Sequence, residues 1–216
     1  MARPRKITTV KPQQAITKNG SHPTRDKLLR ATVELMREHL PQAITSEMVL
    51  QKSGISRGSM YHHFQDFSEL LELAMVDAFA NAVDKSITAF TTLLHTAKNR
   101  DDMVQGLSVV TGKTQARALK QLRLQRARLI SFTEDNPRLA ASMASEQQRL
   151  TDAITDLIRG AQERKWMSQS FDPRSAAVLI QAYTLGKIVD DIVPNPMSET
   201  GWNDLIGQII EKVLAA

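Results

Sequence analysis

The chain has 216 residues, 42% of them hydrophobic, and carries a formal net charge of +5. A chain of this length and hydrophobic content can form a substantial core, in one large domain or in a small domain beside a larger one. The absence of cysteine excludes disulfides and thiolate metal sites, and no run of eighteen apolar residues or signal-peptide pattern predicts a membrane span or secretion. The sequence alone therefore favours a cytoplasmic protein.

The positive charge is concentrated in the N-terminal part of the chain. Residues 1–65 contain eleven basic and four acidic side chains, a net charge of +7, whereas the remainder carries −2. A basic module on a near-neutral body is typical of a protein that binds the phosphate backbone of a nucleic acid. The basic amphipathic helix with an aromatic face that a membrane surface would require is not found.

The first 22 residues are polar, basic and interrupted by Pro4, Pro12 and Gly20, which predicts an unstructured arm. Arg3, Arg5 and Lys6 in this arm are candidate DNA contacts. After Thr24, which is a predicted N-cap, apolar residues recur at helical spacing from Arg25 to Leu40. Pro41 ends this first helix.

The segment Thr45–Phe64 is the most informative part of the sequence. A short helix over Ser46–Lys52 is followed by Gly54, which can adopt the positive φ of a tight turn. Ser56 then caps a second short helix that is rich in polar and basic residues. Two short helices joined by a turn with glycine predict a DNA-reading helix-turn-helix, and the alternative is an ordinary αα-hairpin.

The rest of the sequence also has helical periodicity, with no alternating β-branched run. The expected helices are Phe67 toward Leu94, Asp101–Val110 ended by Gly112, Gln115–Phe132, one that opens at Asn136-Pro137, one from Asp172-Pro173 through Ile192, and Glu199–Leu214. These patterns predict an all-α fold of about nine helices.

Two apparent motifs are rejected. The run Gly106–Thr114 resembles a phosphate-binding loop but has five residues between its glycines instead of four, and no strand precedes it. The adjacent His62 and His63 point to different faces of a helix, which makes joint ligation of a metal poor. We expect no metal site, no cofactor and no catalytic residues.

The segment from Thr24 to Leu70 resembles the N-terminal domain of TetR-family transcriptional repressors. The likeness rests on Thr45, Ser53-Gly54-Ile55-Ser56, Gly58-Ser59-Met60-Tyr61 and His63-Phe64. Two positions depart from the family pattern. Leu50 stands where alanine is usual, and Phe67-Ser68 stands where a phosphate-binding lysine and an acidic residue are usual.

The resemblance implies roles for several of these residues. Thr45 and Ser46 would bind phosphates. Arg57 would bond the O6 and N7 of guanine, and the alternatives are a phosphate contact or a solvated charge. Tyr61 would contact phosphate or thymine, and the alternative is a half-buried side chain with a satisfied hydroxyl. The full candidate set for DNA binding in this segment is Thr45, Ser46, Glu47, Arg57, Gly58, Ser59, Tyr61, His62 and His63.

Arg126 is a candidate ligand-binding residue in the C-terminal part. On its predicted helix it shares a face with Leu122 and Ile130, where an unpaired charge would be costly. It either pairs with an internal carboxylate, extends outward to solvent, or meets an anionic ligand.

The two closing helices carry apolar and small residues that favour close packing. They could belong to the core of one chain or form a four-helix contact between two chains. The candidate dimer-interface residues are Ala177, Leu185, Trp202, Ile206, Ile209 and Val213.

We therefore expect a basic arm over residues 1–22, a helix-turn-helix domain over residues 23–68 and a ligand-binding and dimerisation domain over residues 69–216. The predicted function is that of a homodimeric repressor that binds a palindromic double-stranded operator and responds to a small-molecule effector. The alternatives are a helical protein–protein adaptor and an enzyme with a scattered site.

Overall fold

The computed structural model describes the backbone of residues 22–214 and the side chains of residues 22–212. This part of the chain is all-α and contains no strand, which confirms the predicted fold class. Its helices are α1 Pro23–Glu38, α2 Ser46–Ser53, α3 Arg57–His63, α4 Phe67–Thr96, α5 Arg100–Gln115, α6 Lys120–Ser131, α7 Pro137–Glu163, α8 Pro173–Gly186, α9 Ile188–Asp191 and α10 Glu199–Ile209, which a π-helical turn continues to Leu214.

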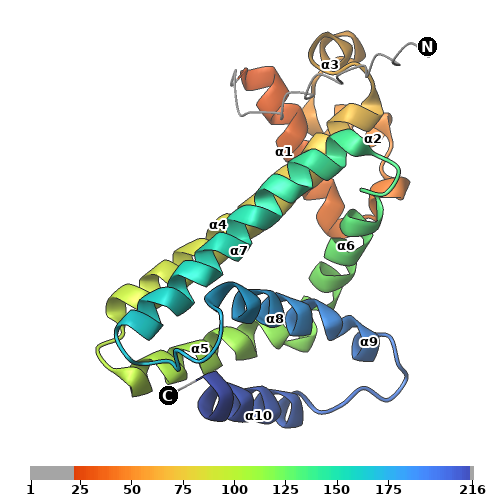
Figure 1. Ribbon diagram of the computed structural model, residues 1–216. Coiled ribbons are helices and arrows are strands. Elements are labelled where there is room, and N and C mark those ends of the chain that lie inside the picture. Colours follow the sequence, from red (N-terminus) through yellow and green to blue (C-terminus); the bar gives the residue numbers. More distant parts are fainter. Residues whose placement is uncertain (1–21, 215–216) are drawn as a thin grey trace, which may run out of the picture.

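Helices α1, α2 and α3 form a small head at one end of the molecule (Figure 1). Its centre consists of Leu28, Val49 and Met60, one from each helix, and all three side chains are fully buried. Phe64 and Leu70 close this core where the chain enters α4. Burial of such side chains, worth about 1.5–3 kcal/mol each, holds three short helices that would not be stable alone.

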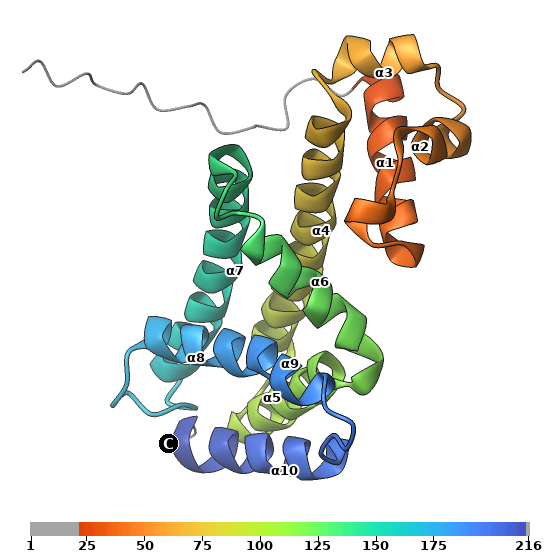
Figure 2. The ribbon, with the colours of Figure 1, turned by 90° about the vertical axis from the view of Figure 1, so that its right-hand side faces the viewer.

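Helix α4 leaves the head and runs beside α7 through the body of the molecule (Figures 1 and 2). The boundary proposed at residues 68 and 69 therefore falls inside a continuous helix. Glu72 of α4 joins the start of α7, because its carboxylate accepts hydrogen bonds from Asn136 (2.7 Å) and Arg138 (2.6 Å). Helices α5 and α8 to α10 lie around the end of this pair that is far from the head, and α6 runs from there toward the head (Figure 2).

Several predicted helix ends differ from the structure, and the helix predicted from Gln115 begins only at Lys120. Helix α1 begins at Pro23, and its N-cap is His22, whose Nδ1 accepts from the Thr24 amide at 3.3 Å. Gly112 lies inside α5 instead of ending it. Helix α8 ends at Gly186, and the buried Lys187 after it donates from its ammonium group to the carbonyl of Gln115.

Candidate nucleic-acid interface and ligand pocket

The turn between α2 and α3 is built by three local signals. Thr45 caps α2 by accepting from the Met48 amide (3.4 Å), and Ser56 caps α3 by accepting from the Ser59 amide (3.2 Å). Between them Gly54 has φ of 63°, a left-handed conformation that side chains with Cβ rarely adopt. The predicted caps and turn are confirmed, and they fix the angle between the two helices.

The sequence-predicted DNA contacts of this segment lie together on the head. Thr45, Glu47, Arg57, Tyr61 and His62 are exposed, and Gly58 beside them leaves the backbone of α3 open. The remaining members are partly covered, namely Ser46, Ser59 and His63. The first turn of α2 and the outer side of α3 thus present hydroxyl, guanidinium, phenol and imidazole groups to solvent. Arg3, Arg5 and Lys6 lie outside the described residues.

Arg57 forms an ion pair with Glu47 of α2. Both side chains are mostly exposed, at 59% and 66%, and a surface pair of this kind contributes at most about 1 kcal/mol. The pKa of Glu47 is lowered chiefly by its backbone hydrogen bond at the helix start, so it stays ionised. The pair therefore holds Arg57 beside α2 but can open at low cost.

Three histidines gather at the junction of α1 and α3. The rings of His22 and His63 are 4.4 Å apart, and those of His62 and His63 are 5.1 Å apart. Partial burial, followed by the neighbouring His22, His62 and Arg25, lowers the pKa of His63. At neutral pH this ring is therefore uncharged and offers one donor and one acceptor.

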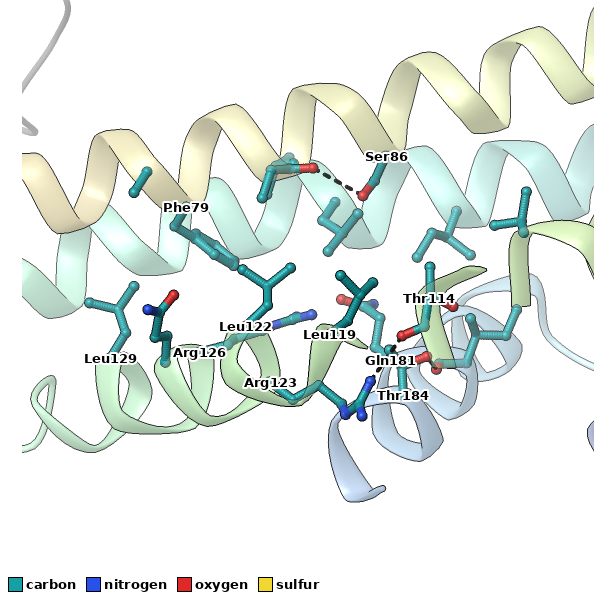
Figure 3. A pocket seen from close by; sticks show the side chains of 18 of the residues that line it. Phe79, Ser86, Thr114, Leu119, Leu122, Arg123, Arg126, Leu129, Gln181 and Thr184 are labelled. Carbon is teal, nitrogen blue, oxygen red and sulfur yellow. Dashed lines mark hydrogen bonds between the residues drawn. The ribbon is translucent and has the colours of Figure 1, made fainter. Parts of the chain in front are cut away.

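A pocket of about 250 Å³ lies in the body between α4, α5, α6, α7 and α8 (Figure 3). Its wall is mainly aliphatic and aromatic, with Phe79 and Phe90 of α4 among the largest side chains. Met36 of α1 and Pro41 after it also line the pocket, so the head itself forms part of the wall. A mostly apolar, preformed cavity with a few polar groups is typical of a small-molecule site.

Arg126 extends from α6 into this pocket (Figure 3). Its Nη2 donates to the side-chain oxygen of Gln147 at 2.8 Å, and its guanidinium carbon lies 5.4 Å from the centre of the Phe79 ring. Burial lowers the pKa of Arg126, and neither an ion pair nor a hydrogen bond with a carboxylate is found for it in the described part of the chain. Of the three possibilities for this residue, the internal carboxylate is therefore wrong.

Comparison with known proteins identifies the family of this helix-turn-helix. Residues 28–74, which contain the capped turn, match the family model for bacterial regulatory proteins of the tetR family. The helix-turn-helix of this chain is therefore similar to that of tetR-family regulators. The HTH-type transcriptional regulator UidR of Escherichia coli (strain K12) is 21% identical over 197 residues, which cover 88% of this chain and 94% of UidR.

Solved structures share the TetR fold along nearly the whole chain. Salmonella enterica GusR superposes with a TM-score of 0.63 and 19% identity, covering 92% of this chain and 98% of GusR. A protein from Saccharomonospora viridis, solved in complex with choline, gives a TM-score of 0.67 at 15% identity, covering 90% and 98% of the two chains. At these identities the likeness concerns the fold.

The two departures from the TetR pattern are accommodated by packing. Leu50 and Phe67 are both partly buried and pack against the hydrophobic core. At position 67 a ring that stabilises the start of α4 thus replaces the basic side chain that the family pattern would place near phosphate. Arg25 of α1 lies over the ring of Phe64, with its guanidinium carbon 5.4 Å from the centre of that ring.

The predicted dimer-interface residues do not all reach the surface of the chain. Ala177 and Ile206 are 0% and 3% exposed because α7 and α5 cover them within the same chain, which makes their assignment to an interface wrong. Leu185, Trp202 and Ile209 are partly buried, and the Trp202 Nε1 donates to the side chain of Gln115 at 3.1 Å. The side chain of Val213 lies outside the described residues.

A different surface of α8 and α9 is apolar and exposed. We call it the α8 face, and it consists of Val178, Leu179, Ala182, Gly186 and Val189. Val189 is 70% exposed, and a Cβ added at Gly186 would meet no atom within 4 Å. Large apolar side chains around small ones allow close helix approach, so this is the surface that a second chain could cover.

Sequence reasoning missed a buried charge cluster below the pocket. Arg123 of α6 donates to Asp191 of α9 from Nε (2.6 Å) and Nη2 (2.8 Å), and Lys187 is buried beside them. Arg123 also donates to the carbonyls of Thr114 and Ala116, both at 3.2 Å. The available signal was Asp191 within Ile-Val-Asp-Asp-Ile-Val, an acid in an apolar run, but nothing local indicates its partner 68 residues away.

None of the described helices is both long enough and apolar enough to span a membrane. The described residues also contain no group of three or more histidine, aspartate and glutamate side chains that could hold a metal ion.

Proposed function

We propose that the protein is a homodimeric repressor that binds a palindromic operator and releases it when a small molecule occupies the pocket. The observation that carries this proposal is that one pocket is lined both by the body and by Met36 and Pro41 of the helix-turn-helix head. A ligand in this position touches the element that reads DNA, so ligand and DNA can favour different head positions.

In the proposed complex α3 lies in the major groove. Arg57 leaves Glu47 and bonds a guanine, while Ser59, Tyr61, His62 and His63 contact neighbouring bases and phosphates. Thr45 and Ser46 place hydroxyl and amide donors at the start of α2, where they set the register on the backbone. The exposed polar face described above supports these roles.

Coupling from the pocket to the head runs through α6. Gln125 of this helix donates from Nε2 to the carbonyl of Met36 in α1 at 3.1 Å, and the next residue, Arg126, extends into the pocket. A ligand that moves Arg126 therefore moves the helix that is bonded to the head. The coupling needs a ligand whose affinity differs between the two head positions.

Dimerisation through the α8 face would place two heads in twofold register. An isologous contact of this kind brings α8 of one chain against α8 of its partner, and half-site spacing in the operator follows from the distance between the heads. The exposed apolar side chains and the open space at Gly186 support this contact.

The decisive experiment selects DNA from a random duplex library with the purified protein and then measures affinity by fluorescence anisotropy over a range of salt concentrations. The expected result is a palindromic site whose affinity falls steeply and log-linearly with salt. An adaptor protein or an enzyme would instead show no sequence enrichment and no salt-dependent retention.

Arg57→Ala is expected to weaken binding to the selected site by about 1–3 kcal/mol and to relax base preference at one position in each half-site, because the variant cannot form the guanidinium–guanine hydrogen bonds. Affinities for single-base variants of the site check this. The matched control is Glu47→Gln, which frees Arg57 and removes a negative charge near phosphate, so it should strengthen binding to all sequences. An equal reduction in affinity on every sequence for Arg57→Ala would make Arg57 a phosphate-binding residue.

Deletion of residues 1–22 is expected to weaken binding and to lower the salt slope. The arm carries Arg3, Arg5, Lys6, Lys11 and Lys18, and each phosphate that is no longer neutralised by a basic side chain reduces the slope by about 0.9. The comparison variant keeps the arm at full length with these five residues changed to glutamine, which separates charge from length. If the truncated protein keeps the wild-type slope, the arm does not bind phosphate.

A further inference from the structure

The side chains that line the pocket carry positive charge without any matching negative charge. Among the described lining residues the only ionisable groups with a formal charge are Arg123, Arg126 and Arg128, and none is aspartate or glutamate. Arg123 is neutralised by Asp191 outside the cavity. Arg126 and Arg128 form no ion pair in the described structure.

Nearly all other polar groups in the wall already have partners in the chain. Ser86, Thr114 and Thr184 donate to backbone carbonyls of their own helices, and Tyr183 and Thr111 bond each other at 3.4 Å. The unsatisfied buried atoms of the wall are Nε of Arg126 and Nη1 of Arg128. Buried donors without partners are rare in folded proteins and suggest a missing acceptor.

Arg126 is held in place by a chain of amides. Gln147 accepts from Arg126 and donates to Gln181, which in turn donates to Thr151 (3.1 Å) and to the carbonyl of Ala177 (3.2 Å). Each amide in this chain is therefore oriented by the next, and α7 and α8 together fix one edge of the guanidinium. The other donors of Arg126 are left for an occupant of the pocket.

We infer that the ligand of this pocket is an anionic amphiphile, with a carboxylate bound by Arg126 and an apolar body packed against Phe79, Phe90 and the aliphatic wall. This inference names the ligand class of the proposed regulator and so rests on the proposed function. A carboxylate supplies both the missing charge and an acceptor for Nε, and a guanidinium can bind its two oxygens together. A neutral ligand would leave the buried cation uncompensated, and a cationic ligand would add a like charge.

Arg126 and not Arg128 is the anchor. The two residues are two positions apart on α6, so their side chains leave the helix about 200° apart and cannot hold the same carboxylate from one side. Only Arg126 combines an amide tether with a position over the Phe79 ring. Arg128 therefore provides a matched control on the same helix with the same change in net charge.

The test uses isothermal titration calorimetry on the purified, DNA-free protein with decanoate, decanol and decyltrimethylammonium as probes. These share one apolar chain and differ in the charge of the head. The expected result is that decanoate binds roughly tenfold to a hundredfold more tightly than decanol, which matches a charge-assisted hydrogen bond, and that the cation does not bind. Comparable affinity for decanol, tighter binding of the cation, or no binding of decanoate overturns the inference.

The variants then locate the anion. Arg126→Met should abolish the preference for decanoate over decanol, whereas Arg128→Met should retain it, and both should keep the wild-type helical content. A preference that survives in Arg126→Met, or is lost only in Arg128→Met, contradicts the anchor. If Arg126→Met does not fold, the three probes on the wild-type chain still decide the sign of the ligand charge. Because no DNA is present, this outcome is independent of whether the chain binds an operator.

Discussion

Asp191→Ala is expected to lower the free energy of unfolding by about 3–5 kcal/mol, the cost of breaking a buried ion pair by removing one partner. The variant removes the carboxylate that pairs with Arg123, which is 5% exposed, beside the buried cation of Lys187, which is 4% exposed. Urea denaturation followed by circular dichroism measures the loss. A change within about 0.5 kcal/mol would show that the pair does not stabilise the fold.

The control for this prediction is the double variant Arg123→Met with Asp191→Leu. It replaces the ion pair with apolar side chains of similar volume, which is often nearly neutral, so it should recover most of the stability lost in the single variant. Lys187 keeps its hydrogen bond to the carbonyl of Gln115 in either variant. If the double variant is as unstable as the single one, a packing defect and not charge explains the effect.

The same pair predicts how stability depends on pH. The hydrogen bonds from Arg123, as the first cause, hold the pKa of Asp191 below its usual value of 3.8. A carboxyl with a lowered pKa in the folded state contributes stability above the unfolded pKa, and this contribution is lost as the pH falls through the folded pKa. The free energy of unfolding of the wild type, relative to that of the double variant, should therefore be constant near neutrality and fall below pH 3.8.

Gly186→Trp is expected to convert the protein from a dimer into a folded monomer and to weaken operator binding by roughly a hundredfold or more, because one head binds only one half-site. Within a single chain a Cβ added at this exposed position meets no atom within 4 Å, so we expect the fold to be unaffected. In the proposed dimer the indole prevents α8 from approaching its partner. Sedimentation velocity, thermal unfolding and anisotropy give the three readouts.

Val109→Trp is the matched control for Gly186→Trp. Val109 is 50% exposed on α5, outside the α8 face, so the same indole there should leave both assembly and DNA affinity unchanged. A wild-type protein that is already monomeric at micromolar concentration and still binds a palindrome tightly would contradict the dimer. A Gly186→Trp protein that remains dimeric would move the interface away from the α8 face.

The helix-turn-helix could be predicted from the sequence because its determinants are local. Thr45 and Ser56 cap helices that begin at the next residue, and Gly54 supplies a turn that no neighbouring element has to enforce. The caps at Asn136 and Asp172 were predictable for the same reason and are confirmed. In each case the side chain of the cap accepts a hydrogen bond from the backbone amide only three residues later.

Features that depend on distant parts of the chain could not be predicted in this way. Gly112 has the pattern of a helix end, but α5 continues through it. Thr111 and Gln115 of the same helix are buried, so packing against the rest of the chain stabilises α5 on both sides of the glycine. Ile206 has the pattern of an interface residue, yet α5 covers it. The periodicity of a sequence shows which face of a helix is apolar. It does not show whether that face packs against the same chain or against a second chain.

The continuity of α4 between the head and the pocket has a geometric consequence. From Phe67 to Phe90 the helix spans about 35 Å, so a rotation of about 5° at the pocket end displaces the head by roughly 3 Å. That displacement is about a quarter of the width of the DNA major groove. Each copy of the chain has its own α4. In a twofold dimer the distance between the two α3 helices would therefore change by up to about twice the displacement of one head. In the proposed dimer, a ligand in the pocket would in this way shift both heads away from the spacing of the DNA helical repeat.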